Sequence, residues 1–87
     1  MAQFGGDCEI RRAGIDPNGL AQLDLKADDG TFGWTWFLSA DGLGREELAT
    51  ALAAIVAGKK VFATINLPDP PGADPAWSRV TRLILNK

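Results

Sequence analysis

The stretch LGREELATALAAIVAGKK, residues 43–60, decides the fold, because it carries the helical pattern of this chain. Its larger apolar residues recur at the spacing of one helix face: Leu48, Leu52, Ile55 and Val56. Glu46 and Glu47 lie in the first turn, where acidic side chains suit the positive end of the helix dipole. Gly58 then ends the helix. The pattern predicts one helix over Leu43–Ala57, with the apolar stripe facing the core.

Three strand-like segments precede this helix. Residues 7–13 predict a first strand, and the turn signal at 16–19 leads into a second strand over 21–27 whose apolar residues alternate cleanly. Asp28-Asp29-Gly30 turns the chain back, as Asp-Gly does in tight hairpins, although the two carboxylates also resemble a fragment of a calcium loop. The third strand, 31–39, places alternate residues on one predicted core face: Phe32, Trp34, Trp36 and Leu38.

Two strand-like segments follow the helix. Residues 61–67 alternate regularly, and residues 77–85 alternate with a slip near Arg82 that predicts a bulge. Between them, residues 68–75 are rich in proline, which lacks the backbone donor of a sheet, so this segment predicts a stiff, extended loop.

The order β-β-β-α-β-β in a single domain over residues 1–87 predicts the fold class. Five short strands need closure to hide their edges, so we expect a five-stranded antiparallel barrel of the OB type, all-β with one helix. The alternative is an α+β sandwich in which a curved sheet packs on the helix. Six residues are predicted to lie in the core of the barrel: Leu23, Leu25, Trp36, Leu52, Ile55 and Val61.

Composition argues against several functions. The 87 residues include no histidine and one cysteine, Cys8, and carry a net charge of −2. Histidine is the commonest general base and metal ligand, so we expect no enzyme activity, no metal and no cofactor. The scattered carboxylates suit turns and solvated faces better than catalysis. A mildly acidic chain is also a poor match for phosphate backbones, and we expect no tight binding to single-stranded DNA at physiological salt.

Two segments of the chain resemble a known family. The alanine-rich helix that runs into Gly-Lys-Lys-Val over Leu48–Val61, and the run Trp77–Asn86, are similar to small secreted bacterial OB-fold proteins that resemble the B subunits of one-A-five-B toxins. The resemblance implies ring assembly and glycan binding. It also implies a secreted or periplasmic mature form without its signal, whereas the sequence by itself leaves a cytoplasmic location open. Cys8 matches a family cysteine whose partner is missing here.

The candidate site residues are those that we expect to be exposed because of their position in the chain. Trp77, after the proline-rich loop, is the best candidate to contact a ligand, with Asp74 and Arg79 beside it. Trp34 and Trp36 are more simply core residues. We expect an oligomer interface that combines small residues of the helix with residues of the last strand: Ala49, Ala53, Ala57, Leu83 and Leu85. Cys8 is either a quiet buried thiol or an intermolecular disulfide partner.

The sequence therefore predicts a non-enzymatic, self-assembling binding module that presents its loops to a glycan or a protein. Two alternatives stay open: a single-stranded nucleic-acid-binding OB domain, or a structural subunit of an extracellular assembly. We expect the chain to be a homo-oligomer, as a ring or a filament, with no membrane span.

Overall fold

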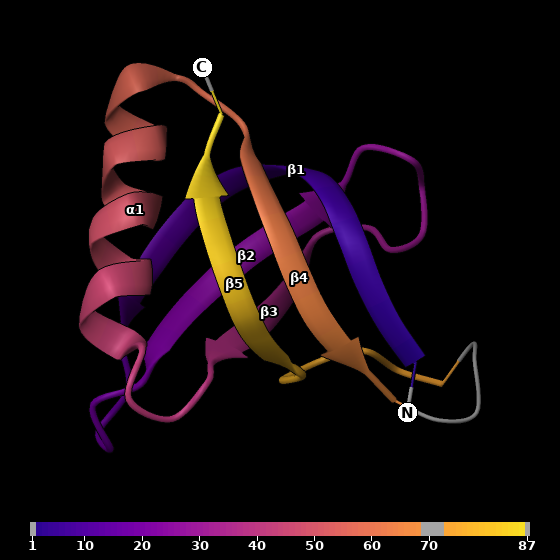
Figure 1. Cartoon of the computed structure of the whole chain (residues 1–87), viewed down its shortest axis with the longest axis horizontal. Helices are drawn as coiled ribbons and strands as arrows, with labels where there is room; N and C mark the ends of the chain where they lie inside the picture. Colours follow the sequence, from indigo (N-terminus) through magenta and orange to yellow (C-terminus); the bar gives the residue numbers. More distant parts are fainter. Residues whose placement is uncertain (1, 69–72, 87) are drawn as a thin grey trace.

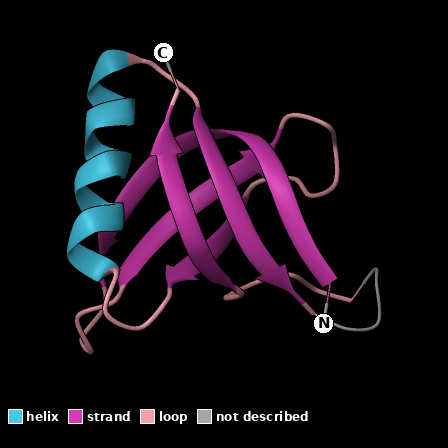
Figure 2. Ribbon diagram, in the orientation of Figure 1, coloured by secondary structure: helices cyan, strands magenta, loops and turns pink. Residues whose placement is uncertain are grey.

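A computed structural model describes residues 2–68 and 73–86 of the chain. Five strands and one helix follow each other in the predicted order over this part (Figures 1 and 2). Their bounds are β1 Ala2–Ile15, β2 Ala21–Ala27, β3 Thr35–Ser39, α1 Gly44–Ala57, β4 Val61–Leu67 and β5 Arg79–Leu85. The helix matches its prediction to within one residue. The first strand is longer than predicted, and the third and fifth begin later. Part of the predicted proline-rich loop, residues 69–72, lies outside the described residues.

The five strands form one sheet that closes in a ring, in the order β1-β2-β3-β5-β4, with β1 also paired to β4. The long β1 makes this closure possible, since Cys8 pairs with Ala27 of β2 on one side and with Val61 of β4 on the other. One pair, β3 and β5, is parallel, which corrects the prediction of a wholly antiparallel sheet. The reason is geometric: strand direction cannot alternate all the way around a ring with an odd number of strands.

Two register shifts bend the ring. In the β4–β5 ladder, Thr64 faces Arg82 but Ile65 faces Val80, so the bulge predicted near Arg82 is confirmed. The second shift was not predicted. It lies in β1, where the pairing with β2 skips Arg11 between Ile10 and Arg12. A bulge of this kind places two residues opposite one, and it sets the arrangement of the outer face described below.

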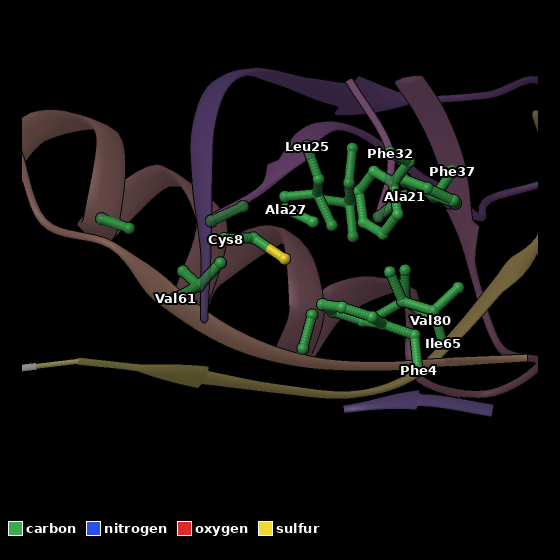
Figure 3. Packing of buried hydrophobic residues seen from close by; sticks show 14 residues of the cluster. Phe4, Cys8, Ala21, Leu25, Ala27, Phe32, Phe37, Val61, Ile65 and Val80 are labelled. Carbon is green, nitrogen blue, oxygen red and sulfur yellow. The ribbon is translucent and has the colours of Figure 1, made fainter. Parts of the chain in front are cut away.

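The core lies inside the ring (Figure 3). Strands β2 and β4 alternate as predicted, so the predicted core positions Leu23, Leu25 and Val61 are confirmed as fully buried. Three phenylalanine rings from distant segments cross the interior in edge-to-face pairs. Phe4 and Phe32 lie 5.1 Å apart, and Phe32 and Phe37 lie 4.9 Å apart between ring centroids. Edge-to-face pairs of this kind add to the energy gained from burial alone.

The predicted inner face of the third strand is wrong. Phe37 is fully buried, whereas Trp36 and Leu38 are half-buried and Trp34 is exposed. Phe32 is buried too, but it lies in the loop before β3, five positions before Phe37. Residues that are an odd number of positions apart lie on opposite faces of a regular strand. Alternation counted from Phe32 therefore assigns every residue of β3 to the wrong face.

The predicted core face of the helix is also wrong in part. Ile55 is half-buried, but Leu52 is 46% exposed and Val56 is 88% exposed. The side of α1 that faces the ring carries Gly44, Glu47, Ala51 and Ala54. A Cβ atom added to Gly44 would lie 2.5 Å from the backbone oxygen of Gly19, so the helix approaches the chain too closely for large side chains. Gly44, Ala51 and Ala54 therefore face the ring beside Glu47, whereas Leu52 and Val56 turn toward solvent.

No described helix has both the length and the apolar character that crossing a bilayer requires.

Candidate functional site

The outer surface of β1, β2 and β3 holds the most distinctive group of side chains. Arg12 of β1, Asp24 of β2 and Trp36 of β3 are partners in register across the three strands. Because neighbouring residues of a strand point to opposite sides, these three face outward while Leu23 and Leu25 face the core. With three further residues they form what we call the arginine–tryptophan face: Arg11, Arg12, Asp24, Trp34, Trp36 and Trp77.

Asp24 fixes two arginines at once. Its oxygen Oδ2 accepts hydrogen bonds from Arg11 Nε at 2.6 Å and from Arg12 Nε at 3.0 Å, and Arg12 Nη2 lies 2.9 Å from the same oxygen. The Asp24 side chain is 2% exposed, while those of Arg11 and Arg12 are about half exposed. Charge-assisted bonds of this kind are short and strong. The bulge makes them possible, since it places both arginines opposite one carboxylate.

Each guanidinium group lies over an indole ring. Arg11 Cζ is 4.3 Å from the centroid of the Trp34 ring, and Arg12 Cζ is 5.0 Å from that of Trp36. Trp36 in turn stacks on Trp77, with ring centroids 6.3 Å apart and an interplanar angle of 16°. Cation–π contacts and stacking hold flat groups in fixed orientations. The face therefore presents flat, amphipathic groups, of which Trp34 is 37% and Trp77 is 49% exposed.

Trp77 is held in an unusual backbone conformation. Its φ is 63°, in the left-handed region that bulky residues rarely adopt. The Trp77 amide donates to the Trp36 carbonyl at 2.7 Å, and the amide of Ser78 donates to the carbonyl of Pro75 at 3.1 Å. Strain of this kind costs about 1–3 kcal/mol and persists where surrounding contacts over-determine the backbone, often at functional sites. Here it coincides with the stacking of the Trp77 indole on Trp36.

The three predicted ligand residues lie around this point, with different roles. Trp77 belongs to the face. Asp74 Oδ1 accepts from the amide of Ala76 at 2.9 Å and so shapes the turn before Trp77. Arg79 Nη1 donates to the carbonyl of Ser39 at 3.1 Å and lies 3.8 Å from Asp41 Oδ1.

Sequence reasoning missed most of the face. It assigned Trp34 and Trp36 to the core, and it did not single out Arg11, Arg12 or Asp24 as a group. One signal was present: two adjacent arginines in one strand and an acid on the polar side of the next. Its meaning depends on the bulge at Arg11, which local alternation does not show.

The predicted interface residues divide into two groups. The helix alanines are exposed, and the two larger residues misassigned to the core lie among them. Together they form what we call the exposed helix stripe: Ala49, Leu52, Ala53, Val56 and Ala57. In β5, Leu83 is half-buried against the core, whereas Ile84 and Leu85 are each 40% exposed. Past Val80, β5 has a ladder partner on its β4 side only.

Cys8 and the 28–30 turn have structural roles in the folded chain. Cys8 is fully buried, and burial raises the pKa of its thiol to about 12, which favours a quiet thiol over a disulfide partner. Asp29 Oδ1 accepts from the amide of Thr31 at 2.9 Å, and Asp28 pairs with Lys60 at 2.8 Å. Within residues 2–68 and 73–86, no cluster of three or more His, Cys, Asp or Glu side chains is placed to hold a metal ion.

Comparison with known protein families, with curated proteins and with solved structures gave no match.

Proposed function

We propose that the chain is a non-enzymatic, self-assembling binding module of the OB type that binds a glycan on the arginine–tryptophan face. One observation carries the proposal: two partly exposed indole rings, Trp34 and Trp77, belong to the same face as two guanidinium groups that Asp24 holds in place.

The chemistry of this face suits a sugar. The apolar C–H face of a sugar ring packs on an indole ring, and its hydroxyl groups accept hydrogen bonds from guanidinium N–H groups. Because Asp24 and the stacked rings already fix these side chains, little further ordering is needed when a ligand binds. The partly exposed guanidiniums of Arg11 and Arg12 keep donors available beyond those bound to Asp24.

The position of the face supports an OB-type domain. OB-folds bind oligosaccharides and oligonucleotides on strands two and three and on the loops beside them, including the loop between strands four and five. Here Asp24 and Trp36 come from β2 and β3, and Trp77 follows the segment that joins β4 to β5. The closed strand order and the helix between β3 and β4 are in keeping with this fold. Resemblance to toxin B subunits adds a secreted or periplasmic location to the proposal.

The binding prediction is tested on an immobilised glycan array, with Trp77→Ala compared with the wild-type chain. We expect glycan binding by the wild-type chain and a loss of about fivefold to 150-fold in Trp77→Ala, because stacking on one aromatic ring contributes about 1–3 kcal/mol. Arg45→Ala, which removes an exposed arginine of α1, serves as the control and is expected to bind normally.

Two results would contradict this prediction. The first is a wild-type chain that binds no glycan, or a Trp77→Ala variant that binds as well as the wild type. The second comes from a thymine oligonucleotide measured in parallel. Submicromolar, salt-dependent binding to it would favour the single-stranded nucleic-acid alternative, for which the net charge of −2 is unfavourable.

Self-assembly is supported by the exposed helix stripe. Its residues recur at the spacing of one helix face, so α1 carries one apolar side toward the ring and a second toward solvent. In the single chain Val56 is almost fully exposed and Leu52 is about half exposed. Such a surface is typical of a contact with another molecule, and Ile84 and Leu85 of the neighbouring β5 add to the exposed apolar area.

We expect sedimentation velocity over about a hundredfold range of concentration to show a homo-oligomer for the wild-type chain. Val56→Lys should shift the population toward monomer without unfolding it, since Val56 is almost fully exposed. Gln3→Lys, at an exposed position of β1, is the matched control. A wild-type chain at monomer mass throughout the range would contradict self-assembly, and an open series of sizes would favour a filament over a ring.

A further inference from the structure

Glu47 occupies an unusual position for a carboxylate. It lies on the side of α1 that faces the ring, together with Gly44, Ala51 and Ala54, and is 4% exposed. Neither of its carboxylate oxygens has a hydrogen-bond partner among the described residues. A buried, unpaired negative charge costs several kcal/mol, so the neutral carboxyl is the form that this position favours. The neighbouring Glu46, by contrast, is exposed and suits the helix dipole as an anion.

The charged groups around Glu47 offer it no compensation. Helix α1 packs against β1, β2 and β5. The charged side chains of these strands are bonded elsewhere or exposed: Asp7, Glu9, Arg11, Arg12, Asp24, Lys26, Arg79 and Arg82. The nearby like charge of Glu46 adds to the cost of burial. Burial first, and then Glu46, raise the pKa of Glu47 from 4.5 to about 8.

The first turn of α1 is packed closely against the chain. A Cβ atom on Gly44 would lie 2.5 Å from the Gly19 oxygen and 3.4 Å from the Ala21 nitrogen, so the first turn sits directly against the chain that enters β2. Glu47 is in the same turn, and its amide donates to the Leu43 carbonyl at 2.9 Å. An ionised Glu47 would therefore place an unpaired charge in the turn that is packed against this part of the chain.

We propose that Glu47 is a proton-dependent latch for α1: the first turn of the helix is seated on the ring when Glu47 carries a neutral carboxyl, and it opens when the carboxyl ionises. The latch depends on the packing of α1 in the single chain and is independent of the glycan proposal.

The direction of the pH dependence follows from the two pKa values of Glu47. Its pKa is about 8 in the seated helix and 4.5 when hydrated, so the seated state holds the proton more tightly. The stabilisation is complete below about pH 4.5 and is lost as the pH rises toward 8. Over that interval the opening equilibrium of the first turn rises by up to about tenfold per pH unit, and it levels off above pH 8.

Amide hydrogen exchange of α1 tests the latch between about pH 5 and pH 9, after correction for the intrinsic exchange rate. We expect the wild-type opening equilibrium to rise with pH as described. Glu47→Gln removes the titration and should give a flat profile. Glu46→Gln removes the neighbouring charge and should keep the rise. An equal rise in wild type and Glu47→Gln, or a flat wild-type profile, would overturn the proposal.

A second measurement does not depend on whether Glu47→Gln folds, because it uses the wild-type chain. The carbon-13 chemical shift of the Glu47 carboxyl, followed by NMR in the wild-type chain, reports its protonation directly. A midpoint well above 4.5 supports the latch, and a midpoint near 4.5 overturns it.

Discussion

Phe37→Ala is expected to lower the free energy of unfolding by about 3–5 kcal/mol, the largest effect we predict for a single substitution. Phe37 is fully buried in β3 and packs edge-to-face on Phe32, which in turn packs on Phe4. Its loss would leave a cavity at the centre of the ring. Because small domains are stable by only about 5–15 kcal/mol, much of the stability of this chain would be lost. Urea unfolding followed by far-ultraviolet circular dichroism measures the change.

Trp36→Ala is the informative comparison for this prediction. Trp36 is the larger residue, but it is half-buried on the outer face, so its loss should cost clearly less than that of Phe37. The reverse ranking would restore the alternation predicted from the sequence and would contradict the observed phase of β3. If Phe37→Ala does not fold, Phe37→Leu retains part of the volume and should still rank above a control such as Glu9→Gln at an exposed site.

Asp24→Asn is expected to lower the free energy of unfolding by about 2–3 kcal/mol and to disorder the arginine–tryptophan face. The amide keeps the shape of the carboxylate but loses its charge, so Arg11 and Arg12 are left side by side without a counter-ion. Water around the half-exposed guanidiniums relieves part of this repulsion, which places the cost below that of a fully buried pair. Urea unfolding measures the stability.

The packing of the arginine–tryptophan face can be measured separately from stability. All three tryptophans of the chain belong to it, so near-ultraviolet circular dichroism reports on their packing. We expect Asp24→Asn to weaken this signal before any global unfolding. The control is Glu9→Gln, which breaks the exposed 3.8 Å pair with Lys26 and should change stability by less than about 0.5 kcal/mol. An unchanged tryptophan signal in Asp24→Asn would show that Asp24 does not organise the rings.

The candidate site shows where reasoning from sequence ends. Trp77 was recognisable because it directly follows a proline-rich segment, at the start of the last predicted strand. The roles of Trp34 and Trp36 were not recognisable. Alternation along a strand looks the same in the sequence whether a tryptophan faces the core or the solvent. Asp24 was recognisable only as one polar residue of β2. Its burial comes from Arg11 and Arg12, which reach it through the bulge in β1.

Local chemistry in the sequence was enough to determine the order of the elements, the bounds of the helix and the inner faces of β2 and β4. Glycine and proline signals mark turns, and alternation between turns of known position needs no further information. Tertiary structure decided three other features. Closure of an odd number of strands made β3 and β5 parallel. The phase of β3, with Phe37 buried, did not follow from Phe32, which is buried in the preceding loop. The close approach of α1 at Gly44 brought small residues, rather than Leu52 and Val56, to the ring. Each of these depends on distances between segments far apart in the chain, which local patterns do not contain.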